Sequence, residues 1–165
     1  MQELAEKFKS QFPEILINEP LKKYSTFHIG GPADYFVIVD SIDNLTAVLK
    51  VLSEQDMSYF MLGGGSNVLI SDEGFAGAVI KVNCKEIKVE DDVIIADAGC
   101  ATAQVAEVTI KAKLSGFEWG VCVPGTIGGA VRGNAGAMGL EMKDSVYKVE
   151  IWRDGEVLEL NNAEC

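Results

Sequence analysis

The chain has 165 residues, of which 48% are hydrophobic and 24% charged, and its formal net charge is −11. This composition is typical of a globular protein, and the length suffices for one domain or two small packed lobes. The negative charge argues against nucleic acid and anionic membranes as partners, because both are bound through clustered Lys and Arg. A phosphorylated small molecule stays possible, since backbone N–H groups can bind phosphate in an acidic protein.

Hydropathy and cysteine usage narrow the class further. No apolar run is long enough to cross a bilayer, and the polar N-terminus does not resemble a signal peptide. We therefore expect a cytoplasmic protein. The four cysteines form no CxxC pair, and the sequence has one histidine, His28. Because zinc sites need ligand pairs at short spacing, we expect reduced thiols and no metal site.

The first half of the chain predicts strands alternating with helices. Within residues 2–12, Leu4, Phe8 and Phe12 would share one face of an opening helix, and we expect residues 1–22 to form this helix and a lead-in. Residues 33–40 are rich in Tyr, Phe, Val and Ile, which is typical of a buried strand.

The pattern then continues as a β-α-β unit. Ser41 is a good N-cap for the following helix, and residues 59–62 and 77–82 predict two further strands. The strand at 59–62 runs directly into three glycines. Ligands of open α/β sheets usually bind at such carboxyl ends of strands, so this turn is a candidate site.

A different pattern begins after residue 83. Residues 87–96 predict a hairpin, residues 102–114 a helix, and residues 120–139 a glycine-rich loop. Residues 146–160 predict a second hairpin that turns at Asp154-Gly155. We therefore expect two α+β lobes, formed by residues 23–83 and 84–165.

The first glycine cluster predicts a phosphate-binding turn. Three successive glycines let several N–H groups point into one concavity, and the Ser and Asn that follow add side-chain donors. A plain tight turn fits this short segment equally well. No GxGxxG follows a strand and no GK[ST] is present, so any phosphate would be bound without a P-loop lysine. The candidate residues are Leu62, Gly63, Gly64, Gly65, Ser66 and Asn67.

The second glycine cluster, VPGTIGGA at 123–130 followed by NAGA at 134–137, has few bulky side chains. Such a surface suits a flat ring or a phosphate lying against backbone, and the alternative is a packed structural loop. The candidate binding residues are Pro124, Gly125, Thr126, Gly128, Gly129, Asn134 and Gly136.

Two further charged or titratable side chains, His28 and Arg132, are candidates for a functional role. His28 has no metal-ligand or nucleophile pattern near it, so a structural role is the more usual reading. Arg132 lies inside the second cluster and is compatible either with a phosphate contact or with solvent exposure. No Ser-His-Asp order, HExxH motif or specific carboxylate pair is present.

Several segments taken together resemble the family of UDP-N-acetylenolpyruvoylglucosamine reductases (MurB). They occur in the family's order over nearly the whole chain: YSTFHIGGPAD at 24–34, LGGGSNVL at 62–69, SDEGF at 71–75, VPGTIGGA at 123–130 and NAGA at 134–137. Arg132 and Met138 depart from residues that are common in the family.

The resemblance implies an α+β, two-lobed FAD-binding domain of the vanillyl-alcohol oxidase (PCMH) type. By position, residues 62–67 would bind the FAD pyrophosphate, and the candidates at 124–129, with Asn134 and Gly136, would line the flavin and its phosphates. Covalently flavinylated relatives commonly have a histidine where this chain has Ser66. Noncovalent FAD is the expected cofactor.

The resemblance also implies an activity for the longer protein. NADPH would reduce the flavin, which would reduce the enolpyruvyl group of UDP-N-acetylglucosamine enolpyruvate to UDP-N-acetylmuramate in peptidoglycan synthesis. The family's catalytic arginine belongs to an FGYR motif, and its serine and glutamate lie further on. The sequence ends at Cys165, before all three, so we expect no catalytic residue here, no C-terminal substrate-binding domain and no activity of this part alone.

We further expect a UDP-sugar as the small-molecule substrate and a monomeric protein. Two alternatives stay open at this point. One is another flavin oxidoreductase of the PCMH type, and the other is a non-catalytic FAD-binding module.

Overall fold

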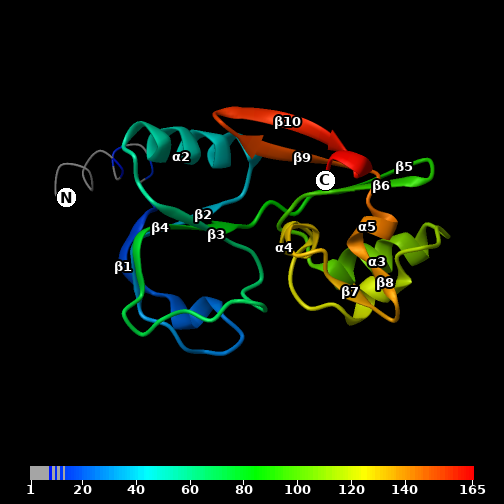
Figure 1. Cartoon of the computed structure of the whole chain (residues 1–165), viewed down its shortest axis with the longest axis horizontal. Coiled ribbons are helices and arrows are strands. Elements are labelled where there is room, and N and C mark those ends of the chain that lie inside the picture. The colour runs from blue at the N-terminus through cyan, green and yellow to red at the C-terminus, as the bar shows by residue number, and fades with distance from the viewer. Residues whose placement is uncertain (1–7, 9, 11, 13) are drawn as a thin grey trace. The chain divides into compact units, whose positions relative to one another are not determined.

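The computed structural model describes residues 8, 10, 12 and 14–165. The chain divides into two compact units, Met1–Asn83 and Cys84–Cys165 (Figure 1). Most of the predicted opening helix, including Leu4, lies outside the described residues. Across the part of the chain that is described, no helix is both long and apolar enough to span a bilayer.

The first unit is built on a four-stranded sheet with the order β1-β2-β4-β3. The parallel strands are β2 (Pro32–Val39), β4 (Phe75–Val82) and β3 (Tyr59–Leu62), which confirms the three predicted strands. The edge strand β1 (Leu16–Pro20) pairs antiparallel with β2 and was not predicted. Its half-exposed sequence LINEP ends in proline, and such edge strands lack the apolar alternation that marks a buried strand.

Helix α2 (Ile42–Glu54) covers one face of this sheet (Figure 1). It begins at the predicted N-cap, because the Ser41 side chain accepts a hydrogen bond from the Asn44 N–H at 3.2 Å. Val48, Leu49 and Leu52 on its inner face are buried. A second core, described next, covers the other face of the sheet. The central strand β4 is thus buried on both faces, which explains its nearly continuous apolar sequence.

The other face of the sheet carries a core that includes the 3-10 helix Leu21–Tyr24. The Tyr24 ring stacks on Phe36, with ring centroids 4.2 Å apart. The buried residues of this core are Leu21, Ala33, Phe36, Leu62 and Val79. Because Leu62 is the last residue of β3, this core fixes the point where the first glycine cluster begins.

The second unit consists of hairpins and short helices. Its hairpins are β5 (Ile87–Glu90) with β6 (Val93–Ala96), β7 (Gly136–Ala137) with β8 (Leu140–Glu141), and β9 (Lys148–Arg153) with β10 (Glu156–Asn161). Its helices are α3 (Thr102–Lys111), the 3-10 helix Glu118–Cys122, α4 (Ile127–Arg132), α5 (Met142–Ser145) and the 3-10 helix Asn162–Glu164. Both predicted hairpins are confirmed, and the second turns where Asp154 and Gly155 have φ of 52° and 90°.

Two predictions for this unit need correction. The predicted helix 102–114 ends at Lys111, and its buried residues are Thr102, Val105, Ala106 and Thr109, two of which are polar. The Thr109 hydroxyl is satisfied inside the helix, since it donates to the Val105 carbonyl at 2.9 Å. The predicted loop 120–139 contains α4, a helix that the low helix propensity of its two glycines concealed.

Candidate functional site

The first glycine cluster forms a turn directly after β3, where the sequence predicts it. Gly65 has φ +72°, and a Cβ built on it would lie 1.9 Å from the Tyr24 carbonyl oxygen. Only glycine fits this position. The Thr26 N–H and hydroxyl both donate to the Gly65 carbonyl, at 3.0 and 3.3 Å. The segment that follows the 3-10 helix Leu21–Tyr24 therefore holds the turn from one side.

A lysine that the sequence analysis did not single out holds the turn from the neighbouring strand. Lys81 of β4 donates from Nζ to the Gly63 carbonyl. In a trans peptide the C=O and the following N–H point in opposite directions. The Gly64 N–H therefore points away from Lys81, and the Ser66 N–H points away from Thr26. With two carbonyls anchored on the protein, the N–H groups that follow them face away from these anchors, an orientation compatible with an anion-binding nest.

A cavity of about 560 Å³ adjoins this turn. It is lined by Lys23, Tyr24, Ser25, Thr26, His28, Gly64 and Lys81. Two lysines and three hydroxyl groups are among these lining residues, and no carboxylate is. In a chain with a net charge of −11, the two lysines of this lining give it a local positive charge, which suits an anion.

Hydrogen bonds and burial shift the pKa values of Glu19 and Tyr24 beside the cavity. Glu19 accepts from Lys23 Nζ and from the Tyr24 hydroxyl, each at 3.0 Å. The Lys23 hydrogen bond holds the pKa of Glu19 below its ordinary value. Burial, followed by the bond to Glu19, raises the pKa of Tyr24, so this phenol stays protonated and donates. His28 is exposed at φ 55° and its N–H donates to the Ser25 carbonyl at 3.2 Å.

The second glycine cluster lies within the other unit, at α4 and its flanks. The Gly128 N–H donates to the Ala98 carbonyl at 2.9 Å, and a Cβ on Gly128 would lie 2.8 Å from the Ala98 Cβ. Close packing inside the protein therefore accounts for Gly128. A Cβ on Gly129 would meet only the Thr126 hydroxyl, at 3.6 Å, so the protein itself leaves room beside Gly129.

Thr126 supplies an unused polar group at the same place. Its hydroxyl is buried and has no hydrogen-bond partner among the described residues. Such a buried hydroxyl costs about 1–3 kcal/mol when it stays unpaired. Open backbone at Gly129 next to an unsatisfied hydroxyl at Thr126 is compatible with a site for a polar ligand.

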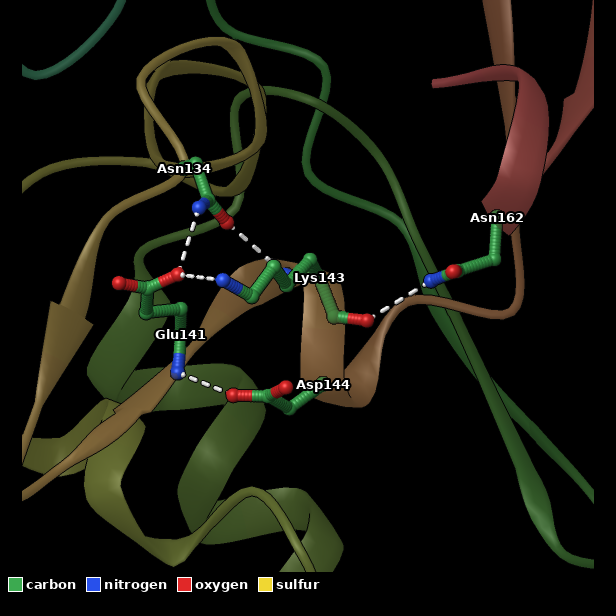
Figure 2. A network of polar contacts seen from close by, with 5 residues as sticks. All are labelled: Asn134, Glu141, Lys143, Asp144 and Asn162. Atoms are coloured by element: carbon green, nitrogen blue, oxygen red, sulfur yellow. Dashed lines mark hydrogen bonds and ion pairs between the residues drawn. The ribbon is translucent and has the colours of Figure 1, made fainter.

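A polar network holds the segment that follows α4 (Figure 2). Asn134 donates from Nδ2 to Glu141 Oε2 at 2.9 Å and accepts the Lys143 N–H on Oδ1 at 3.0 Å. Lys143 Nζ also pairs with Glu141 Oε2 at 2.6 Å. Hydrogen bonds from Lys143 and then Asn134 lower the pKa of Glu141. The Asn134 side chain is thus engaged inside the protein, and it ties the two sides of the β7–β8 hairpin together.

The network extends to the last helix of the unit. The Glu141 N–H donates to Asp144 Oδ2 at 2.9 Å, which caps α5. Asn162 Nδ2 donates to the Lys143 carbonyl at 2.8 Å (Figure 2). It also donates to the Val146 carbonyl at 2.7 Å. The two Asn162 bonds connect segments 19 and 16 positions apart in the chain and tie the last helix to the segment that follows the glycine cluster.

The structure therefore places the predicted residues in two groups. Leu62 and residues 63–67 form the turn of the first unit, and residues 124–136 form α4 and its flanks in the second. Lys81 and Thr26, which hold the turn, were not predicted from the sequence as residues of this site. A lysine inside the otherwise apolar sequence FAGAVIKV was the available signal. Among the described residues, no group of His, Cys, Asp and Glu is arranged to hold a metal ion.

Comparison with known proteins identifies the family of this architecture. Residues 33–161 match the model of the FAD binding domain family. The chain is 40% identical over 165 residues to the UDP-N-acetylenolpyruvoylglucosamine reductase of Caldanaerobacter subterraneus subsp. tengcongensis, covering 98% of this chain and 55% of that protein. It is 42% identical over 146 residues to the reductase of Syntrophomonas wolfei, covering 87% and 49%.

Solved structures agree with these sequence relatives. The crystal structure of UDP-N-acetylenolpyruvylglucosamine reductase (MurB) from Thermus caldophilus superposes with a TM-score of 0.75 at 30% identity, covering 92% of this chain and 53% of that one. Alkyldihydroxyacetonephosphate synthase shares the fold, with a TM-score of 0.70 at 16% identity over 98% of this chain and 35% of that one.

These matches confirm two expectations from the sequence, the resemblance to UDP-N-acetylenolpyruvoylglucosamine reductases and the PCMH-type α+β fold. The chain spans about half the length of the curated relatives described above. Since the family model covers most of the sequence, the chain belongs to the FAD binding domain family.

Proposed function

We propose that the chain is the FAD-binding part of an NADPH-dependent reductase of the enolpyruvyl group of UDP-N-acetylglucosamine enolpyruvate, which yields UDP-N-acetylmuramate in peptidoglycan synthesis. The observation that carries the proposal is 40% identity, over 98% of this chain, to a UDP-N-acetylenolpyruvoylglucosamine reductase. The proposed enzyme is a cytoplasmic monomer whose substrate is a UDP-sugar. Residues 23–83 and 84–165 are the proposed FAD-binding lobes, preceded by a lead-in at 1–22.

The first lobe is proposed to bind the FAD pyrophosphate. Leu62 and the turn Gly63, Gly64, Gly65, Ser66 and Asn67 supply the site. Anchoring of the Gly63 and Gly65 carbonyls by Lys81 and Thr26 supports this role, because it directs N–H groups away from these anchors. Backbone donors and a nearby ammonium offset the diphosphate charge. Since Ser66 stands where flavinylated relatives commonly have histidine, the FAD is proposed to be noncovalent.

The second lobe is proposed to line the flavin and its phosphates. Pro124, Gly125, Thr126, Gly128 and Gly129 provide the surface, with Asn134 and Gly136 completing it. The room beside Gly129 and the unpaired Thr126 hydroxyl support this assignment. The bonds of the Asn134 side chain inside the protein indicate that it acts by positioning this surface.

When bound, FAD supplies hydride transfer from NADPH to the substrate's double bond. The residues of this chain bind the cofactor, orient it and compensate its phosphate charge. The groups that protonate the substrate and stabilise developing negative charge are proposed to belong to other segments of a longer protein.

Flavin content tests the cofactor assignment directly. Purified, concentrated chain should be yellow, and denaturation should release the flavin spectrum into the supernatant. Colourless protein that is folded by circular dichroism and takes up no added FAD would refute the assignment.

A pair of glycine variants tests the role of the turn. Gly64→Val should abolish FAD retention while most secondary structure persists, since a side chain there blocks approach to the N–H groups. Gly155→Asn, in the tip of the β9–β10 hairpin, is the control and should retain FAD, because the site has open space and Asn tolerates its positive φ. Undiminished flavin in Gly64→Val would show that the segment is only a turn.

The activity is tested on a longer protein that contains this chain. It should oxidise NADPH only when the enolpyruvyl UDP-sugar is present. Equal oxidation without the sugar would indicate another flavin oxidoreductase of this fold, and bound FAD without any oxidation would indicate a non-catalytic module.

A further inference from the structure

We infer that Lys81 is a positioning residue for the FAD diphosphate, and that it serves this chain in place of the lysine of a P-loop. The inference rests on the proposed FAD site. Lys81 belongs to β4, whereas the turn follows β3, so the lysine reaches the turn from a neighbouring strand and not from within the glycine motif.

The register of the sheet places Lys81 next to the turn. Leu62 of β3 pairs in parallel with Lys81 of β4. Paired residues of adjacent strands direct their side chains to the same face of a sheet. Lys81 therefore stands on the face that carries Leu62, one residue before the turn begins, and its half-buried side chain donates to the Gly63 carbonyl.

This bond determines which way the Gly63–Gly64 peptide faces. Neither glycine has a Cβ, so sterics alone leave both orientations of that peptide accessible. With the carbonyl held by Lys81, the Gly64 N–H points away from the lysine. In the opposite orientation a carbonyl oxygen would replace the N–H and would repel a phosphate.

The position of Lys81 also lets its positive charge act on a ligand in the cavity beside the turn. Lys81 and Gly64 line the same cavity, together with Lys23. A diphosphate approaching a chain of net charge −11 meets overall repulsion. A half-buried ammonium beside the turn offsets this locally and is screened less by salt than an exposed one.

Three variants of the 165-residue chain test the inference. Lys81→Met removes the donor and the charge at similar length, and Lys81→Arg keeps both. Lys50→Met removes one exposed lysine of α2 and is matched for net charge. The Kd for FAD is measured by flavin fluorescence at several KCl concentrations, and the melting temperature without FAD by circular dichroism.

We expect Lys81→Met to weaken FAD binding about tenfold or more, the effect of losing one charge-assisted contact. The slope of log Kd against log KCl concentration should also flatten. Lys81→Arg and Lys50→Met should stay within about threefold of the unchanged chain. A merely structural lysine would lower the melting temperature without changing the salt slope.

Unchanged affinity and salt slope in folded Lys81→Met would overturn the inference, and so would equal loss in Lys81→Arg. If Lys81→Met does not fold, Lys81→Gln replaces it, since its amide keeps a donor without the charge. Lys81→Gln should then show the flattened salt slope, and the parent slope would overturn the charge role. Failure of the unchanged, folded chain to bind FAD would refute the proposed function instead.

Discussion

Asn134 and Glu141 are joined by a hydrogen bond of 2.9 Å from Nδ2 to Oε2 that closes the base of the β7–β8 hairpin (Figure 2). Asn134 has φ 44°, a left-handed conformation that Asn tolerates better than most residues. The same side chain accepts the Lys143 N–H. Asn134, which the sequence predicts as a cofactor contact, therefore also stabilises the β7–β8 hairpin through its bonds to Glu141 and Lys143.

Replacing Asn134 separates these effects. Asn134→Gly keeps the left-handed backbone but loses both side-chain bonds, whereas Asn134→Ala loses the bonds and adds strain. We expect both to lower the free energy of unfolding in urea, with alanine the lower by about 1–2 kcal/mol. Equal stability of the two variants would show that the backbone relaxes away from φ 44°.

Thr126 belongs to the proposed cofactor surface, and Thr102, which does not, serves as its control. Both hydroxyls are buried without a partner among the described residues. Replacing either with the isosteric valine should raise the free energy of unfolding without FAD by up to about 1 kcal/mol. Only Thr126→Val should reduce the rise in melting temperature that added FAD produces. The same reduction in Thr102→Val would place the ligand elsewhere.

Gly128 and Gly129 are adjacent, but the first is packed against the protein and the second faces open space, so alanine variants should affect them differently. Gly128→Ala should cost about 1–3 kcal/mol of unfolding free energy, because the new Cβ would lie 2.8 Å from the Ala98 Cβ. Gly129→Ala should instead stabilise α4 by about 0.5–1 kcal/mol without FAD.

The same Gly129→Ala protein should bind FAD more weakly than the unchanged chain if the flavin occupies the open space. Thermal unfolding with and without FAD gives both numbers. Undiminished FAD affinity in Gly129→Ala would remove Gly129 from the cofactor surface.

The contact between Glu19 and Lys23 beside the cavity should be sensitive to acid. The hydrogen bond from Lys23 lowers the pKa of Glu19 in the folded state, so its contribution to stability is present above the unfolded-state pKa of about 4.3. That contribution is lost as pH falls through the lower, folded-state value. Because Lys23 is largely exposed, the effect should be modest.

Glu19→Gln should therefore flatten the fall of melting temperature between about pH 5 and pH 3, while changing little at pH 7 beyond a constant offset. Thermal unfolding across this range makes the comparison. Parallel pH profiles for the variant and the unchanged chain would contradict the linkage.

The sequence was sufficient to predict those elements whose stabilising contacts lie within a few residues of one another in the chain. The Ser41 cap, the strand at 59–62 and the Asp154-Gly155 turn were all predicted, because each depends on bonds or dihedral angles within a few residues. Helix α4 was not, since it forms against Ala98 and Cys100, about 30 positions earlier, despite its glycines. Tertiary contacts overrode the helix propensity of residues 127–132.

By itself the sequence determined that three glycines follow a strand, that the Rossmann and P-loop patterns are absent and that its ordered motifs resemble one flavoprotein family. Only the tertiary structure decided how the glycine turn is oriented. Its carbonyls are held by Thr26, 39 positions before Gly65, and by Lys81, 18 positions after Gly63. Glycine leaves a peptide free to face either way, so the direction of the N–H groups is set by partners that only folding brings together.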